Sequence, residues 1–207
     1  AKENGIWRDD IEKEFDSTYG TEETEKNTEG GESIVWFDRD RGVAVKAIGL
    51  DYYGSPTLAL ERIELHNKYF PHAPLNIVGF GEVKDIIGQD GEVELYGRPF
   101  NIIAEQPLID TTTELSKDEI RDRLEAMGVK GVADKGDAGW DMETPDGLAR
   151  VSDLHERNVF GTRDGGVAVI DCDIRKKTKK DLAKQLSEKY PNIDADRVLE
   201  HLAKFDS

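Results

Sequence analysis

The chain is organised around two neighbouring stretches, VSDLHERNVF at residues 151–160 and GGVAVID at residues 165–171. Together they predict a short loop, a strand, a turn and a second, apolar strand. This hairpin has Asp153 before its first strand, Asn158 at the start of that strand and Asp171 at its end, so three oxygen ligands can meet at one place. Because Mg²⁺ prefers oxygen ligands and is usually shared with phosphates, the stretch predicts a magnesium site.

Another hairpin is expected near the beginning of the chain. Gly30 and Gly31 form a glycine turn before a β-branched and aromatic strand at residues 34–37, and a returning strand follows at residues 43–48. The returning strand is apolar except for Lys46, and a lysine in such a strand requires a partner if it is buried.

The rest of the first half is expected to hold helices and further strands. The Ser-Pro pair at residues 55–56 combines an N-cap residue with a first-turn proline, so a helix is predicted to run from there to about Tyr69. Trp7, Ile11 and Phe15 are spaced like one face of a short helix. Further strands are predicted at residues 75–83, 92–96 and 100–104, followed by a linker between lobes at residues 105–109.

The second half has a different composition. Ser116 opens a predicted helix with a capping-box pattern, whereas residues 128–146 are rich in Gly and Asp and favour no single element. The one basic cluster, residues 176–180, is expected to be a solvated helix entrance or, alternatively, a site for an acidic substrate. Two further helices are predicted near residues 181–189 and 194–205.

The composition limits the possible partners. A net charge of -16 excludes nucleic-acid binding by bulk electrostatics and predicts repulsion from an anionic membrane. The single Cys172 excludes an internal disulfide and a multi-cysteine zinc site, which indicates a cytoplasmic protein. No apolar run has the length of a membrane span and no signal peptide opens the chain. The first residue is Ala rather than Met, as expected of a processed or excised piece of a longer protein.

The order of these segments resembles the protein-kinase-like fold. A Gly-Gly turn precedes a hairpin that closes in VAVK at residues 43–46, and a helix carrying Glu61 follows. The catalytic loop, DLHERN at residues 153–158, is similar to the D-L-H-x-x-N of aminoglycoside and choline phosphotransferases, and VID follows at residues 169–171.

The wider pattern resembles the small kinase-like domain of bacterial mobile-element polyvalent proteins. In that domain a helix running into N-x-x-F-P, here residues 67–71, precedes a Val-Gly-Phe strand, and the resemblance covers roughly residues 18–175. It implies an α+β, bilobal kinase-like fold. The N-terminal lobe would be a mostly antiparallel sheet with one helix (residues 1–105), and the C-terminal lobe would be small and helical (residues 106–207).

The resemblance also implies roles for the residues that match its motifs. Asp153 would accept the proton of the attacking hydroxyl or orient that hydroxyl, and Asn158 and Asp171 would hold Mg²⁺. Lys46 would contact the α- and β-phosphates of ATP, and Glu61 would hold Lys46 in place. Two alternatives stay open, because Glu64 lies on the same helix as Glu61 and Asp173 follows Asp171 closely.

The remaining implied contacts involve the nucleotide. Gly30 and Gly31 would let backbone amides approach the phosphates, although a plain hairpin turn explains them equally well. Ala44 would face the adenine, and the backbone of Glu105 and its neighbours would hydrogen-bond the adenine edge.

Three functions are therefore considered. The first is ATP- and Mg²⁺-dependent phosphotransfer to a hydroxyl group of a protein or small molecule, without nucleic-acid or membrane partners. The second is a catalytically weak pseudokinase or nucleotide-binding interaction module, because few residues remain after Asp171 for a C-terminal lobe and the glycine loop begins with an acidic segment at residues 22–25. The third is an acidic protein that binds partners through its charged surface and has no nucleotide site.

Overall fold

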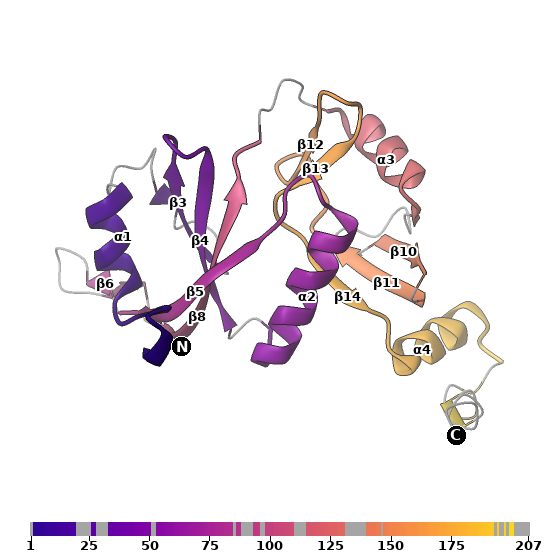
Figure 1. The fold of residues 1–207 in the computed structure, drawn as a ribbon. Helices are drawn as coiled ribbons and strands as arrows, with labels where there is room; N and C mark the ends of the chain where they lie inside the picture. Colours follow the sequence, from indigo (N-terminus) through magenta and orange to yellow (C-terminus); the bar gives the residue numbers. More distant parts are fainter. Residues whose placement is uncertain are drawn as a thin grey trace. The chain divides into compact units, whose positions relative to one another are not determined.

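The computed structural model describes most of the chain and divides it into two compact units. The residues described are 2–19, 26–27, 33–50, 53–84, 86–87, 93–95, 98–109, 115–130, 140–145, 147–192, 194, 197 and 199–200. Unit 1 comprises Ala1–Glu114 and Val159–Ile170, and unit 2 comprises Leu115–Asn158 and Asp171–Ser207. Each unit has its own sheet (Figure 1).

Unit 1 is built on a six-stranded sheet in the order β1-β5-β8-β4-β3-β2. All neighbours in it are antiparallel except β1 and β5, which are parallel. Two short ladders, β6–β7 and the hairpin β12–β13, complete the strands of this unit. The strands are β1 (Trp7–Arg8), β2 (Lys26–Asn27), β3 (Ser33–Asp38), β4 (Val43–Gly49), β5 (Asn76–Val83), β6 (Ile86–Ile87), β7 (Val93–Leu95), β8 (Arg98–Pro107), β12 (Val159–Gly161) and β13 (Val167–Val169); a 3-10 turn, η1 (Lys2–Asn4), precedes β1.

Helices α1 (Ile11–Tyr19) and α2 (Pro56–Tyr69) cover opposite faces of this sheet (Figure 1). The core on the α1 face contains the buried residues Ile11, Phe15, Ile34, Trp36, Val45, Ala47, Val83 and Ile103. The core on the α2 face contains Ile48, Ala59, Ile63, Ile102 and Ala104. Alternate residues of β4 therefore belong to different cores, as expected of a strand covered on both sides.

The capped helix α2 confirms the sequence expectation. The Ser55 hydroxyl accepts a hydrogen bond from the Leu58 N–H at 3.2 Å, and proline occupies the first turn. The helix ends at Tyr69, before Pro71. Asn67 then fixes the following chain, because its side chain donates to the Leu75 carbonyl at 2.8 Å and accepts from the Leu75 N–H at 2.7 Å.

The N-terminal helix is shorter than the spacing of its apolar residues suggested. Trp7 lies in β1, opposite Phe80, rather than on the helix. The helix begins at Ile11 because the Asp10 carboxylate accepts a hydrogen bond from the Lys13 N–H at 3.2 Å, as an N-cap residue does. Close approach of β1 to β5 depends on Gly81, where a Cβ atom would lie 2.4 Å from the Arg8 carbonyl oxygen.

The linker predicted at residues 105–109 begins too early. Glu105 and Gln106 belong to β8, which continues to Pro107, and Glu105 lies opposite both Val45 and Asn76. The sheet continues because β8 is an inner strand with partners on both sides, which a reading of local composition does not reveal.

Unit 2 contains a four-stranded antiparallel sheet that the sequence analysis did not predict, since it expected a helical lobe. The strand order is β14-β11-β10-β9. Buried residues alternate with polar ones along these strands, and Met142, Ala149, Val151 and Ile174 occupy the buried face. The elements are β9 (Val129–Lys130), β10 (Trp140–Thr144), β11 (Gly147–Ser152), β14 (Asp173–Lys176), α3 (Lys117–Ala126) and α4 (Lys179–Lys189).

The helices of unit 2 agree with their sequence signals. Ser116 and Glu119 form the expected capping box at the start of α3. Helix α4 covers the first of the two predicted C-terminal helices, whereas most of residues 194–205 lie outside the described residues. In the portion of the chain that the structure describes, the helices are too short and too polar to cross a membrane.

Candidate functional site

The predicted catalytic loop is closed by hydrogen bonds between its two ends. The Asn158 side-chain nitrogen donates to the backbone carbonyl of Asp153 and to Asp153 Oδ2, both at 3.0 Å. Asp153 has a φ of +66°, a left-handed conformation that is uncommon outside glycine but is tolerated by aspartate. The sequence motif thus forms a compact turn in which Asn158 holds the backbone and the carboxylate of Asp153.

His155 makes a further contact inside this loop. Its Nδ1 accepts a hydrogen bond from the Arg157 N–H at 3.2 Å, which places the ring proton on Nε2. Nε2 lies 3.1 Å from Asp153 Oδ1. His155 therefore orients the Asp153 carboxylate.

The sheet of unit 2 positions Asp171 relative to this loop. Strands β11 and β14 pair up to Ser152 opposite Asp173. The loop that begins with Asp153 leaves this end of the ladder, and Asp171 lies two residues before the paired Asp173, so both approach the same end of the sheet. The alternative metal residue, Asp173, is already part of β14.

Lys46 is buried in unit 1 and has an acceptor there. Its relative exposure is 8%, and its Nζ donates to the backbone carbonyl of Ile170 at 2.8 Å. The register places Lys46 opposite Ala104, on the sheet face that α2 covers. Ile170 directly precedes Asp171, so the ammonium holds the residue before the predicted metal ligand.

The two candidate glutamates of α2 differ in exposure. Glu61 is half-buried, whereas Glu64 is exposed to solvent. Ile63, between them, packs in the core on the Lys46 face of the sheet. Glu61 is therefore the less exposed of the two candidates.

The predicted adenine residues lie on β4 and β8. Ala44 is buried on the same face as Lys46, opposite Gln106. Glu105 directs its carboxylate to Arg41, with Arg41 Nη2 at 2.5 Å from Glu105 Oε1. That bond raises the pKa of Arg41, and Asp38 adds to it from 3.6 Å. Gly30 and Gly31 lie outside the described residues.

Two buried polar residues beside this strand were missed by the sequence analysis. Gln106 and His66 both approach the Ala73 carbonyl, at 2.8 Å and 2.9 Å, and both are almost fully buried. They tie the turn after α2 to β8. The signal available in the sequence was weak, because a lone His or Gln in an apolar segment does not reveal its partner.

The predicted site residues divide between the two units. Ala44, Lys46, Glu61 and Glu105 lie in unit 1, and Asp153, Asn158 and Asp171 lie in unit 2. Within unit 1, Ala44 and Lys46 share one sheet face. Within unit 2, hydrogen bonds join Asp153 to Asn158.

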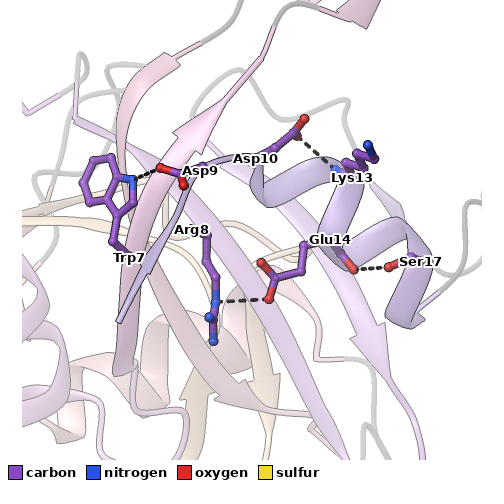
Figure 2. Close-up of a pocket in the computed structure, with 7 residues that line it drawn as sticks. All are labelled: Trp7, Arg8, Asp9, Asp10, Lys13, Glu14 and Ser17. Atoms are coloured by element: carbon purple, nitrogen blue, oxygen red, sulfur yellow. Dashed lines mark hydrogen bonds and ion pairs between the residues drawn. The ribbon is translucent and has the colours of Figure 1, made fainter. Parts of the chain in front are cut away.

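An open groove of about 470 Å³ on unit 1 contains none of these residues. Figure 2 shows its lining, which comes from β1 and the first two turns of α1. The lining polar groups bond to each other, including Arg8 with Glu14 at 3.2 Å and Trp7 with Asp9 at 3.0 Å. These bonds hold the N-terminal segment against α1, and none of the predicted site residues lines the groove.

No metal cluster of the usual type is found in the described parts of either unit: no three or more His, Cys, Asp or Glu side chains gather there to hold an ion. A kinase-like site is of another type, because it uses an asparagine and an aspartate together with phosphate oxygens.

The elements of the chain follow the order found in kinase-like domains. A strand carries a lysine, the next helix carries a glutamate, a later loop contains the Asp–Asn pair, and a following strand ends before an aspartate. Comparison with protein families agrees. Residues 1–178 match the family described as "Serine/Threonine/Tyrosine Kinase found in polyvalent proteins", and the chain belongs to this family. The resemblance to the kinase-like domain of polyvalent proteins is thereby confirmed. No curated protein and no solved structure gives a significant match.

Proposed function

We propose that the chain is an ATP- and Mg²⁺-dependent phosphotransferase that acts on a hydroxyl group of a protein or small molecule. The observation that carries the proposal is the loop in which Asn158 holds both the backbone and the carboxylate of Asp153. Membership of the Ser/Thr/Tyr kinase family supports the same reaction class.

In the proposed reaction the acceptor hydroxyl attacks the γ-phosphorus of ATP. The bond from that phosphorus to the β–γ bridging oxygen breaks, ADP leaves, and the hydroxyl proton passes to the Asp153 carboxylate. The Asp153 side chain is 55% exposed, which allows an acceptor to reach it, and His155 and Asn158 keep it in one orientation.

Residues for the nucleotide and the metal are proposed on chemical grounds. Because Asn158 gives its amide nitrogen to Asp153, its amide oxygen is the group left for a cation, and Asp171 adds an exposed carboxylate. A bound Mg²⁺ would neutralise charge on the phosphates. Lys46, supported by Glu61, would add positive charge at the α- and β-phosphates.

The adenine and phosphate contacts remain proposals of the same kind. Ala44 would face the adenine ring, and the backbone around Glu105 would bind its edge. Gly30 and Gly31 would approach the phosphates through their backbone amides.

Isothermal calorimetry with Mg-ATP and an assay with labelled ATP test this proposal. Asp153→Asn is expected to keep Mg-ATP binding while phosphotransfer falls by about 10²- to 10⁴-fold, the usual contribution of a positioned proton acceptor. Asp171→Asn is expected to weaken Mg-ATP binding as well. Asp122→Asn, an exposed change on α3, serves as the matched control. Wild-type protein that gives no heat with Mg-ATP would refute the proposal.

A nucleotide-binding module without turnover is the second candidate, and a specific observation favours it. The residue two positions after Asp171 is already paired in β14, so the segment that follows the predicted metal ligand is part of a sheet. Lys46 also has a backbone carbonyl as an acceptor. Mg-ATP binding that is lost in Asp171→Asn, without phosphotransfer to any peptide or alcohol in a broad panel, would select this candidate.

A further inference from the structure

The outward face of the unit 2 sheet carries a cross-strand row of charged residues. Asp141 on β10 lies opposite Arg150 on β11, and Arg150 lies opposite Arg175 on β14. Their neighbours along each strand, Met142, Ala149, Val151 and Ile174, are buried on the other face. The two arginines therefore lie side by side on the opposite face, where Arg175 is exposed and Arg150 is half-buried.

The one carboxylate in this row is engaged by a different cation. Lys177 Nζ lies 2.5 Å from Asp141 Oδ1, and the Lys177 side chain is 5% exposed. Arg150 and Arg175 form no ion pair with any residue in the described ranges. Like charges directly opposite each other in a sheet are destabilising, so the pair is retained at a cost in stability.

Three further acidic residues, Asp173, Asp181 and Glu143, lie on or near this face. Asp181 faces Arg175 and Lys177, but its carboxylate accepts hydrogen bonds from the Thr178 hydroxyl at 2.7 Å and the Thr178 N–H at 2.9 Å. These bonds hold the pKa of Asp181 below its ordinary value. Glu143, on the same face as Asp141, lies opposite Leu148, two pairs beyond the basic row.

The position of the arginines connects them to the proposed chemistry. Arg150 lies two residues before Ser152 and Arg175 two residues after Asp173, so both are about 7 Å along a strand from the pair at which the loop of Asp153 begins. A peptide whose hydroxyl reaches Asp153 would have its flanking residues within reach of this row. In a chain of net charge -16, two adjacent cations that form no ion pair among the described residues attract anions locally.

We propose that Arg150 and Arg175 form a docking surface for acidic residues that flank the acceptor hydroxyl of a peptide substrate. The proposal rests on the proposed phosphotransfer, whose acceptor it narrows to an acidic peptide. The overall negative charge of the chain disfavours a nucleic acid as the occupant.

Binding is measured by fluorescence anisotropy at low ionic strength, without ATP, so that the result does not depend on turnover. The probes are a labelled peptide with a central serine flanked by glutamates and the same peptide with glutamines. The wild-type protein is expected to prefer the glutamate peptide. The double variant R150Q/R175Q is expected to bind that peptide about tenfold more weakly, with the preference lost.

Two controls separate docking from folding and from general charge. The pair R121Q/K184Q removes two positive charges elsewhere in unit 2 and is expected to leave binding unchanged. Because R150Q/R175Q relieves a like-charge pair, its thermal midpoint should equal or exceed that of the wild type, so weaker binding would not reflect unfolding.

Three results would overturn the inference: equal binding of both peptides by the wild type, unchanged binding by R150Q/R175Q, or tighter binding of a single-stranded oligonucleotide than of the glutamate peptide. If the proposed phosphotransferase function were wrong, calorimetry would show no Mg-ATP binding, which is a different result from a change in peptide binding. Charge-selective peptide binding that persists in Asp153→Asn would support the surface independently of turnover.

Discussion

Lys46 combines burial in an apolar strand with a backbone carbonyl as its acceptor. Taking an ammonium out of water is costly, and a hydrogen bond to a charged donor returns part of that cost. The Ile170 carbonyl at 2.8 Å supplies such a bond. An apolar side chain at this position would avoid the cost of desolvating the ammonium.

Replacement of Lys46 should therefore separate stability from function. Lys46→Met keeps the length and apolar stem of the side chain, so the free energy of unfolding should change by only about 1 kcal/mol. Phosphotransfer should fall by at least about 10²-fold, because the positive charge at the phosphates is lost. Urea unfolding and the labelled-ATP assay measure the two quantities. Normal activity in Lys46→Met would remove Lys46 from the site.

At the scale of elements, helix α3 shows how a local sequence signal fixes a boundary. Ser116 and Glu119 hydrogen-bond to each other in both directions across the first turn. The bonds from the Ser116 hydroxyl and backbone N–H to the carboxylate lower the pKa of Glu119 below its ordinary value of 4.5. The charged form is thus the one that caps the helix.

A pH dependence follows from the direction of that change. A carboxyl group whose pKa is lower in the folded state contributes stability above its unfolded pKa, and this contribution is lost as the pH falls below 4.5 through the folded value. Glu119→Gln should therefore show a smaller loss of thermal midpoint on acidification than the wild type. Glu125→Gln, on the same helix, is the control and should behave like the wild type. Parallel curves for all three proteins would contradict this account of the capping box.

The sequence predicted those elements whose signals are local. The Ser-Pro start of α2 and the turn between β3 and β4 needed no distant partner. The unit 2 sheet was missed because β11 pairs with β14, which follows it only after the predicted catalytic loop and the hairpin. The same limit applies to the site. DLHERN predicted that Asp153 and Asn158 share one loop, whereas the arginine row appears only once the register of three strands is known.

At the scale of the whole molecule, charge acts on stability and on binding in opposite directions. A net charge of -16 makes the folded chain repel itself, and added salt screens that repulsion. The same salt screens the attraction between the Arg150–Arg175 surface and an acidic peptide. Screening by salt therefore increases stability but weakens peptide binding, so a single salt titration distinguishes the two effects.

Raising the ionic strength from well below to well above the physiological value should therefore raise the thermal midpoint and weaken binding of the glutamate peptide. Scanning calorimetry and anisotropy in the same potassium chloride series measure both. R150Q/R175Q should keep the rise in thermal midpoint, since two charges change the net charge little, and should lose most of the salt dependence of binding. If the double variant kept the wild-type salt dependence of binding, the peptide would be held by charges elsewhere on the molecule, because screening acts on the attraction that is present.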